Sequence, residues 1–110
     1  MKKVLVLLAV LTLTSCVVNN PKPEDCKVRT VTINSIKEGS SNDIIFFSNS
    51  GDRFYINRGL EQDLNLDSLN AKVLNKTVTL HLAKVLGGMV TSEHISQLAV
   101  NEEILFTEFE

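Results

Sequence analysis

The feature that most restricts the fold of this chain is period-two alternation of apolar and polar residues in several short stretches. In residues 28–33 one face would carry Arg29, Val31 and Ile33 and the other Val28, Thr30 and Thr32. β-Branched residues on both faces are typical of a β-strand. Residues 76–83 alternate more cleanly, and Val78, Leu80 and Leu82 fall on one face of the predicted strand. A chain with this pattern has to form a sheet with one face turned towards a core.

The pattern is interrupted once and then continues as a hairpin. Ile36 is out of phase with the apolar residues before it, so we expect a β-bulge near residues 34–35. Residues 43–48 form an apolar run and residues 53–56 a second short strand, with the turn sequence Asn-Ser-Gly-Asp at 49–52 between them. These stretches predict two paired antiparallel strands.

One helix is expected, within residues 63–74. Leu66, Leu69 and Val73 have the spacing of one helical face, and Asn65 is a suitable N-cap. Asn75 can adopt the left-handed conformation that ends helices. Further strands are predicted at residues 76–83 and 95–100, with a short final strand at 104–107.

The predicted order is three strands, one helix and two strands, followed by the short final one. Over about residues 27–107 this order resembles the OB-fold, a small Greek-key barrel. We therefore expect a mainly β protein with an OB-like barrel of five to six strands. The alternative is a β-sandwich or roll with one helix on a face. The ligand face of an OB-fold lies on its second and third strands, so the resemblance implies a candidate ligand face at Arg53, Tyr55 and Arg58.

The first sixteen residues have the order of a secretory signal peptide. Lys2 and Lys3 precede an aliphatic run at residues 4–13, which is too short for the ~20 residues that span a bilayer. The run ends in Leu-Thr-Ser-Cys, which resembles the lipobox of bacterial lipoproteins. That resemblance implies cleavage before Cys16, a lipid on its sulfur and an acyl group on the new amino terminus.

The expected organisation is a signal peptide at 1–15, a lipidated N-terminus and tether at 16–26, and one domain at 27–110. Both prolines of the chain lie in the tether. In the enteric lipoproteins an aspartate after the lipidated cysteine signals inner-membrane retention, so Val17 favours the outer membrane. We expect a protein of the bacterial cell envelope that faces the periplasm or the cell surface.

Charge and cysteine content limit the partners. The chain has 11 Lys and Arg against 13 Asp and Glu, and loss of Lys2 and Lys3 leaves 9 against 13, a net charge of −4. This excess of acids disfavours nucleic acid, so we expect no nucleic-acid partner. Cys26 is expected to be a free thiol, with a disulfide to another chain or to Cys16 as the alternatives.

No residue pattern predicts catalysis, and we expect neither an enzyme nor a cofactor. The favoured hypothesis is a non-enzymatic envelope lipoprotein, bound to the membrane by its lipid, that binds an envelope protein or polymer. The alternative is an OB-type binder of oligosaccharide or another small polar ligand through Arg53 and Tyr55. A weaker hypothesis is a metal site of His81 and the Glu93-His94 pair, although these are better explained as solvated surface residues and no metal is expected.

Overall fold

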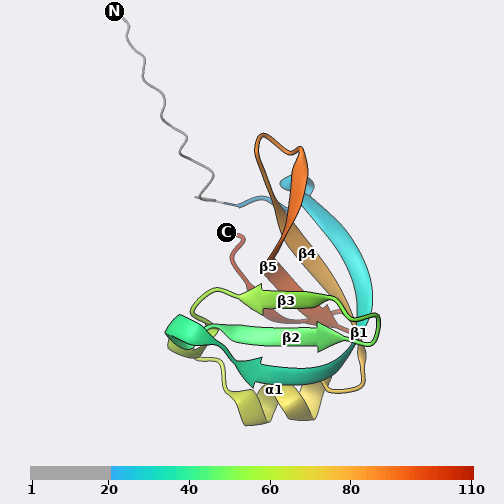
Figure 1. Cartoon of the computed structure of the whole chain (residues 1–110), viewed down its shortest axis with the longest axis vertical. Helices are drawn as coiled ribbons and strands as arrows, with labels where there is room; N and C mark the ends of the chain where they lie inside the picture. Colours follow the sequence, from blue (N-terminus) through green and yellow to red (C-terminus); the bar gives the residue numbers. More distant parts are fainter. Residues whose placement is uncertain (1–20) are drawn as a thin grey trace, which may run out of the picture.

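The computed structural model describes residues 21–110, so the predicted signal peptide, Cys16 and the first part of the tether lie outside the described residues. Three 3₁₀ turns occur, η2 (Pro23–Asp25), η3 (Ser40–Asn42) and η4 (Gly59–Glu61). The helix and strands, in chain order, are β1 (Cys26–Glu38), β2 (Ile44–Ser48), β3 (Arg53–Ile56), α1 (Leu66–Val73), β4 (Thr77–Val85), β5 (Val90–Val100) and β6 (Glu103–Thr107) (Figure 1).

The strands close into a barrel. Their order is β3-β2-β1-β4-β5-β6, and β3 also pairs with β5 in parallel, with Tyr55 opposite His94. Strands β1 to β5 therefore form a closed mixed barrel, and β6 extends it along β5. This arrangement confirms the predicted OB-like barrel. The alternative prediction, a β-sandwich or roll, is wrong because the strands close into a barrel.

The long strand β1 belongs to both halves of the barrel. Its residues 26–32 pair with β4, and Ile33 to Glu38 pair with β2. The register shifts between Ile33 and Ser35, so the predicted bulge is confirmed. The shift lets Ile36 join Ile33 among the buried side chains, which explains why these two residues are out of phase in the sequence.

Strand β5 differs from its prediction. It begins at Val90 rather than Ile95, because β4 and β5 form a hairpin whose pairing reaches Val85 opposite Val90. The first residues of β5 are polar or exposed and lie beyond the core, so their sequence lacks the apolar alternation of a buried strand.

Helix α1 forms as expected. The side chain of Asn65 accepts a hydrogen bond from the backbone nitrogen of Ser68, and Leu69 and Val73 are buried. Asn75 has a φ of 63°, the left-handed conformation that was predicted for it. Across residues 21–110 no helix is long and apolar enough to cross a membrane.

The core fills the inside of the barrel. It is made of aliphatic side chains from β1 to β5 and α1, together with one phenylalanine each from β2, β3 and β6. Its fully buried members include Ile33, Ile44, Phe46, Ile56, Val73, Leu80, Ile95 and Leu98.

Candidate functional site

A charged groove of about 240 Å³ lies at the mouth of the barrel, where β1 begins. Its floor is made by two core side chains, Phe54 of β3 and Leu82 of β4. Its walls come from the start of β1, the β2–β3 turn with the start of β3, and the start of β5, and consist of Lys27, Arg29, Asp52, Arg53, Thr91, Ser92 and Glu93. We call this set the mouth groove.

The pleat of β1 places two cations in the mouth groove. Val31 and Ile33 are buried in the barrel, and Arg29 and Lys27 precede Val31 by two and four residues, so they share its face. The guanidinium carbon of Arg29 lies 5.5 Å from the centre of the Phe54 ring. A cation over an aromatic ring is favoured by the charge distribution of the ring, so Phe54 helps to hold Arg29 in place.

An ion pair across the groove fixes Arg29 further. Its Nη2 lies 3.1 Å from Oδ2 of Asp52, and both side chains are partly exposed. The turn holds Asp52 in position, because its Oδ2 also accepts a hydrogen bond from the Ser50 hydroxyl and its backbone nitrogen donates to Ser48 Oγ. Gly51 permits this tight turn with a φ of 91°.

A second ion pair crosses the seam between β3 and β5. Nη1 of Arg53 lies 3.1 Å from Oε1 of Glu93, and about half of each side chain is exposed. The seam has a single pair of facing residues, Tyr55 and His94, so the Arg53–Glu93 contact also ties its two strands together.

The mouth groove has a net charge of +1. It contains three cations and two carboxylates, and each carboxylate is bonded to an arginine. Within residues 21–110, Lys27 makes no ion pair. Each arginine uses one terminal nitrogen for its carboxylate, which leaves further N–H donors for another acceptor.

Tyr55 lies beside the mouth groove but does not line it. Its ring meets the ring of His94 edge-on, with centres 5.5 Å apart and an angle of 88° between the planes. Burial raises the pKa of the Tyr55 hydroxyl, and the negative charges of Asp43 and Glu93 add to this effect. The hydroxyl is therefore neutral at physiological pH.

Arg58 is separated from Arg53 by the length of β3. It has a φ of 51°, and its backbone nitrogen donates to Oδ1 of Asp43, 2.8 Å away. Of the three residues of the predicted ligand face, Arg53 lines the mouth groove, Tyr55 lies on the adjoining seam and Arg58 follows the other end of β3.

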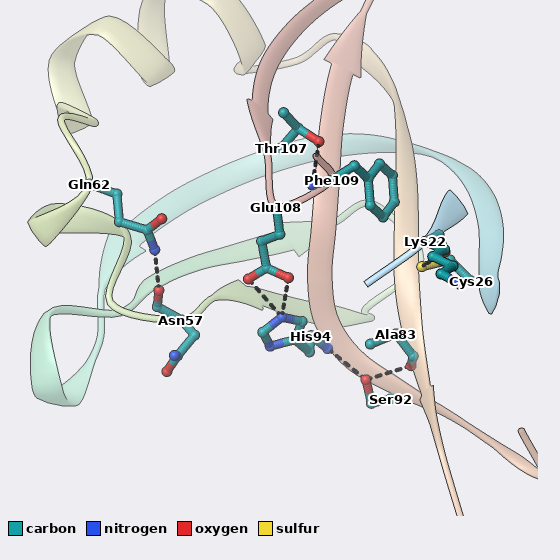
Figure 2. A network of polar contacts seen from close by, with 10 residues as sticks. All are labelled: Lys22, Cys26, Asn57, Gln62, Ala83, Ser92, His94, Thr107, Glu108 and Phe109. Carbon is teal, nitrogen blue, oxygen red and sulfur yellow. Dashed lines mark hydrogen bonds and ion pairs between the residues drawn. The ribbon is translucent and has the colours of Figure 1, made fainter. Parts of the chain in front are cut away.

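The two histidines contact the C-terminal tail rather than each other. Nε2 of His94 lies 2.9 and 3.0 Å from the two carboxylate oxygens of Glu108 (Figure 2). His81 packs edge-on against Phe109, and its Nδ1 is buried without a hydrogen-bond partner. Both histidines are surface residues, as expected, but they are only partly solvated because the tail partly covers them.

No arrangement that could hold a metal ion was found in residues 21–110. Groups of three or more His, Cys, Asp or Glu side chains at suitable positions do not occur there. Figure 2 shows Glu108 pointing to His94, while Ser92 bonds to the backbone of Ala83 and of His94.

Cys26 forms no disulfide within the described part of the chain. Its thiol is half-buried and lies 3.5 Å from the carbonyl oxygen of Lys22. Burial raises the pKa of the thiol, and the charges of Asp25 and Glu108 contribute in the same direction. Cys26 is therefore a weakly reactive thiol at neutral pH.

Comparison with known proteins adds no relative: no family model, curated protein or solved structure matches this chain.

Most of the mouth groove was missed by the sequence analysis. Arg53 was identified, Glu93 was named only as part of a possible metal site, and Lys27, Arg29 and Asp52 were not identified. One signal was present, because Lys27 and Arg29 share the strand face of Val31, and a cation on an inward face at the end of a strand indicates the mouth of a barrel. Nothing in the sequence indicated that Asp52 and Glu93 would face them.

Proposed function

We propose that this protein is a bacterial envelope lipoprotein that is anchored through Cys16 and acts as a non-enzymatic binding module. The mouth groove is its binding site, and the ligand is a carboxylate-bearing sugar residue of an envelope polymer. The anchor is supported by the signal-like N-terminus and its Leu-Thr-Ser-Cys ending. The ligand class is supported by the charges and shape of the groove.

The observation that carries the ligand class is the pair of fixed arginines over an apolar floor. Arg29 and Arg53 are held by Asp52 and Glu93, so little side-chain freedom is lost when their remaining donors bind a ligand. Guanidinium groups suit carboxylates because two parallel N–H donors match two oxygens. Lys27 supplies the excess positive charge, and the buried ring of Phe54 supports Arg29 from the core side of the groove.

The size of the groove limits the ligand. Pockets that enclose drug-sized molecules have volumes of about 300–1,000 Å³, whereas the mouth groove has about 240 Å³. It therefore suits one sugar ring rather than a long segment. A single ring held by partly exposed groups would bind weakly, so we expect an affinity in the millimolar to high micromolar range for the isolated sugar.

The anchor is tested by replacing Cys16. In cells, the native protein should be recovered with the membranes and incorporate labelled palmitate. The Cys16→Ala variant should lose both properties, and Cys26→Ala serves as the matched control because it removes the other cysteine. Membrane association that survives Cys16→Ala would contradict the anchor.

The binding site is tested on the detergent-solubilised mature protein. Titration with galacturonic acid should shift the amide resonances of Arg29, Arg53 and Leu82, whereas galactose, which lacks the carboxylate, should have at least tenfold weaker effects. Arg53→Gln should abolish the response, and Arg58→Gln is the control because Arg58 lies outside the groove. Equal responses to the two sugars, or equal loss in both variants, would contradict a carboxylate site in the mouth groove.

A further inference from the structure

The tip of the β4–β5 hairpin carries the two most exposed large apolar side chains of residues 21–110, Met89 and Leu86, and next to them the exposed Val90. Leu86 is 62% exposed, Met89 85% and Val90 44%. The three lie within five consecutive residues, so together they form one apolar tip. Apolar side chains grouped in this way indicate a contact with another apolar surface.

The tip projects away from the barrel. Leu86, Gly87 and Gly88 all have positive φ values, which produce a tight turn after β4. A Cβ atom placed on Gly87 or Gly88 would meet no atom within 4 Å apart from those of the adjoining residues, so the side of the turn to which it would point is open. Figure 1 shows the hairpin extending from the barrel beside the start of β1.

The hairpin and the N-terminal segment lie at the same end of the molecule. Cys26, the first residue of β1, pairs with Ala83 of β4. Ahead of it, Glu24 and Asp25 line a surface depression together with Gly87 and Gly88 of the turn. The chain therefore enters the barrel beside the apolar tip.

The length of chain before the described residues limits how far the tip can be from a lipid at Cys16. Five residue steps separate Cys16 from Pro21, and a fully extended chain spans at most about 3.6 Å per residue. Pro21 would thus lie within about 18 Å of the lipidated residue. A hairpin that projects from this same end is then within reach of the bilayer.

We propose that Leu86, Met89 and Val90 insert into the bilayer surface that holds Cys16, so that the barrel docks on the membrane in one orientation. This inference rests on the lipid anchor of the proposed function. Apolar side chains of surface-bound segments enter the boundary between headgroups and acyl chains to a depth of about 5–10 Å. The anchor keeps the tip at a high local concentration near the lipid, so a contact too weak to bind alone becomes populated.

Charge indicates that this contact is apolar rather than electrostatic. Glu24, Asp25 and Lys84 lie at the base of the hairpin and sum to −1. They offer no basic cluster of the kind that attracts anionic lipids. Insertion should therefore occur in neutral phosphatidylcholine and should not increase when anionic lipid is added.

Docking would bring the mouth groove close to the membrane. Thr91, Ser92 and Glu93 of the groove directly follow Val90 on β5, and Lys27 follows Cys26 on β1. The groove would then accept sugar residues located near the lipid surface rather than those far from it.

The test uses a single tryptophan as a depth probe, because the chain contains none. Met89→Trp is introduced into the mature lipidated protein, which is then reconstituted in phosphatidylcholine vesicles. Its emission should shift to shorter wavelength and be quenched by brominated lipid. Ile104→Trp is the matched control, since Ile104 is 56% exposed and lies opposite Ala99, nine residues along β5 from Val90.

The outcomes separate this inference from the proposed anchor. Quenching of Met89→Trp but not of Ile104→Trp supports a docked barrel. In another outcome the protein sediments with the vesicles while neither tryptophan is quenched, or while both are quenched equally. Either result overturns the docking and leaves the anchor intact. If the mature protein carries no lipid and does not sediment, the anchor fails and the docking fails with it. Met89→Trp combined with Cys16→Ala should show no quenching, and quenching there would mean that the tip binds lipid without an anchor.

Discussion

Nε2 of the His94 imidazole lies 2.9 and 3.0 Å from the two carboxylate oxygens of Glu108. This contact fixes the C-terminal tail across β5. An ionised carboxylate only accepts hydrogen bonds, so Nε2 carries the proton and donates it. Next to this contact, the backbone nitrogen of Glu108 donates to the Ser96 carbonyl oxygen over 2.8 Å. Phe109 can therefore lie over His81 on the outside of the barrel.

Removal of the carboxylate should loosen the tail. We expect Glu108→Ala to lower the free energy of unfolding by about 1–2 kcal/mol, because a partly buried hydrogen bond to a charged group is lost. Urea unfolding measures the change, and faster exchange of the residue 108 amide would localise it. Glu110→Ala is the control, since Glu110 is exposed. An unchanged stability with a still-protected amide would show that Phe109 alone holds the tail.

The raised pKa of Tyr55 should make the protein less stable at alkaline pH. Because burial raises the pKa of the folded-state hydroxyl, the unfolded chain releases this proton first as the pH rises. The stabilisation is complete below about pH 10, the ordinary pKa of tyrosine, and is lost as the pH rises through the folded-state pKa. Ultraviolet absorbance follows the titration directly because Tyr55 is the only tyrosine. Tyr55→Phe should flatten this part of the stability profile, and an ordinary titration in the folded protein would contradict the prediction.

Gly59 should not tolerate a larger side chain. A Cβ at this buried position would lie 2.6 Å from Cδ1 of Ile44 and 3.0 Å from Cγ2 of Ile56, both in the core. We expect Gly59→Ala to cost about 1–3 kcal/mol through overpacking, as measured by chemical unfolding.

A second substitution tests whether this contact is the cause. Ile44→Val removes the closest atom, Cδ1, and alone should cost about 0.5–1.5 kcal/mol. Combined with Gly59→Ala, the two costs should be less than additive because the closest contact is removed, although the contact of 2.9 Å with Cγ1 of residue 44 remains. Strict additivity would show that Gly59→Ala acts through the backbone instead.

The cap of α1 should contribute measurably to stability. Asn65→Ala removes the acceptor for the Ser68 nitrogen, and we expect a loss of about 1 kcal/mol. Asn65→Asp keeps an acceptor and should retain most of the stability. Thermal unfolding of the two variants provides the comparison, and equal losses would indicate that the cap bond contributes little.

The parts of the fold that the sequence predicted are those governed by nearby residues. The inward positions Val78, Leu80 and Leu82 follow from the period of a strand, and the Asn65 cap follows from the helix beside it. The bulge near Ser35 was also visible, because a change of phase between Ile33 and Ile36 needs only local information.

The parts that were missed depend on residues far apart in the chain. Arg29 and Asp52 are 23 positions apart and meet because β1 pairs with β2, whereas Arg53 and Glu93 are 40 apart and meet because the barrel closes between β3 and β5. Closure itself depends on the parallel pairing of β3 with β5, which no short sequence pattern encodes. The mouth groove could therefore be identified only from the tertiary structure, although the sequence alone indicates which face of β1 carries Arg29.

The seven consecutive pairs between the start of β1 and β4 determine how the barrel would respond to force. A pull on the segment before Pro21 reaches the barrel at Cys26 and acts along β1. Residues 26–32 of β1 face residues 83–77 of β4 without a break, so their hydrogen bonds share the load in parallel. The mouth groove lies on this same segment, which begins at Lys27 and includes Arg29. Tension between the N-terminus and a ligand in the groove would thus act mainly on the start of β1, which these hydrogen bonds hold to β4, and little of it would reach the core around Phe46.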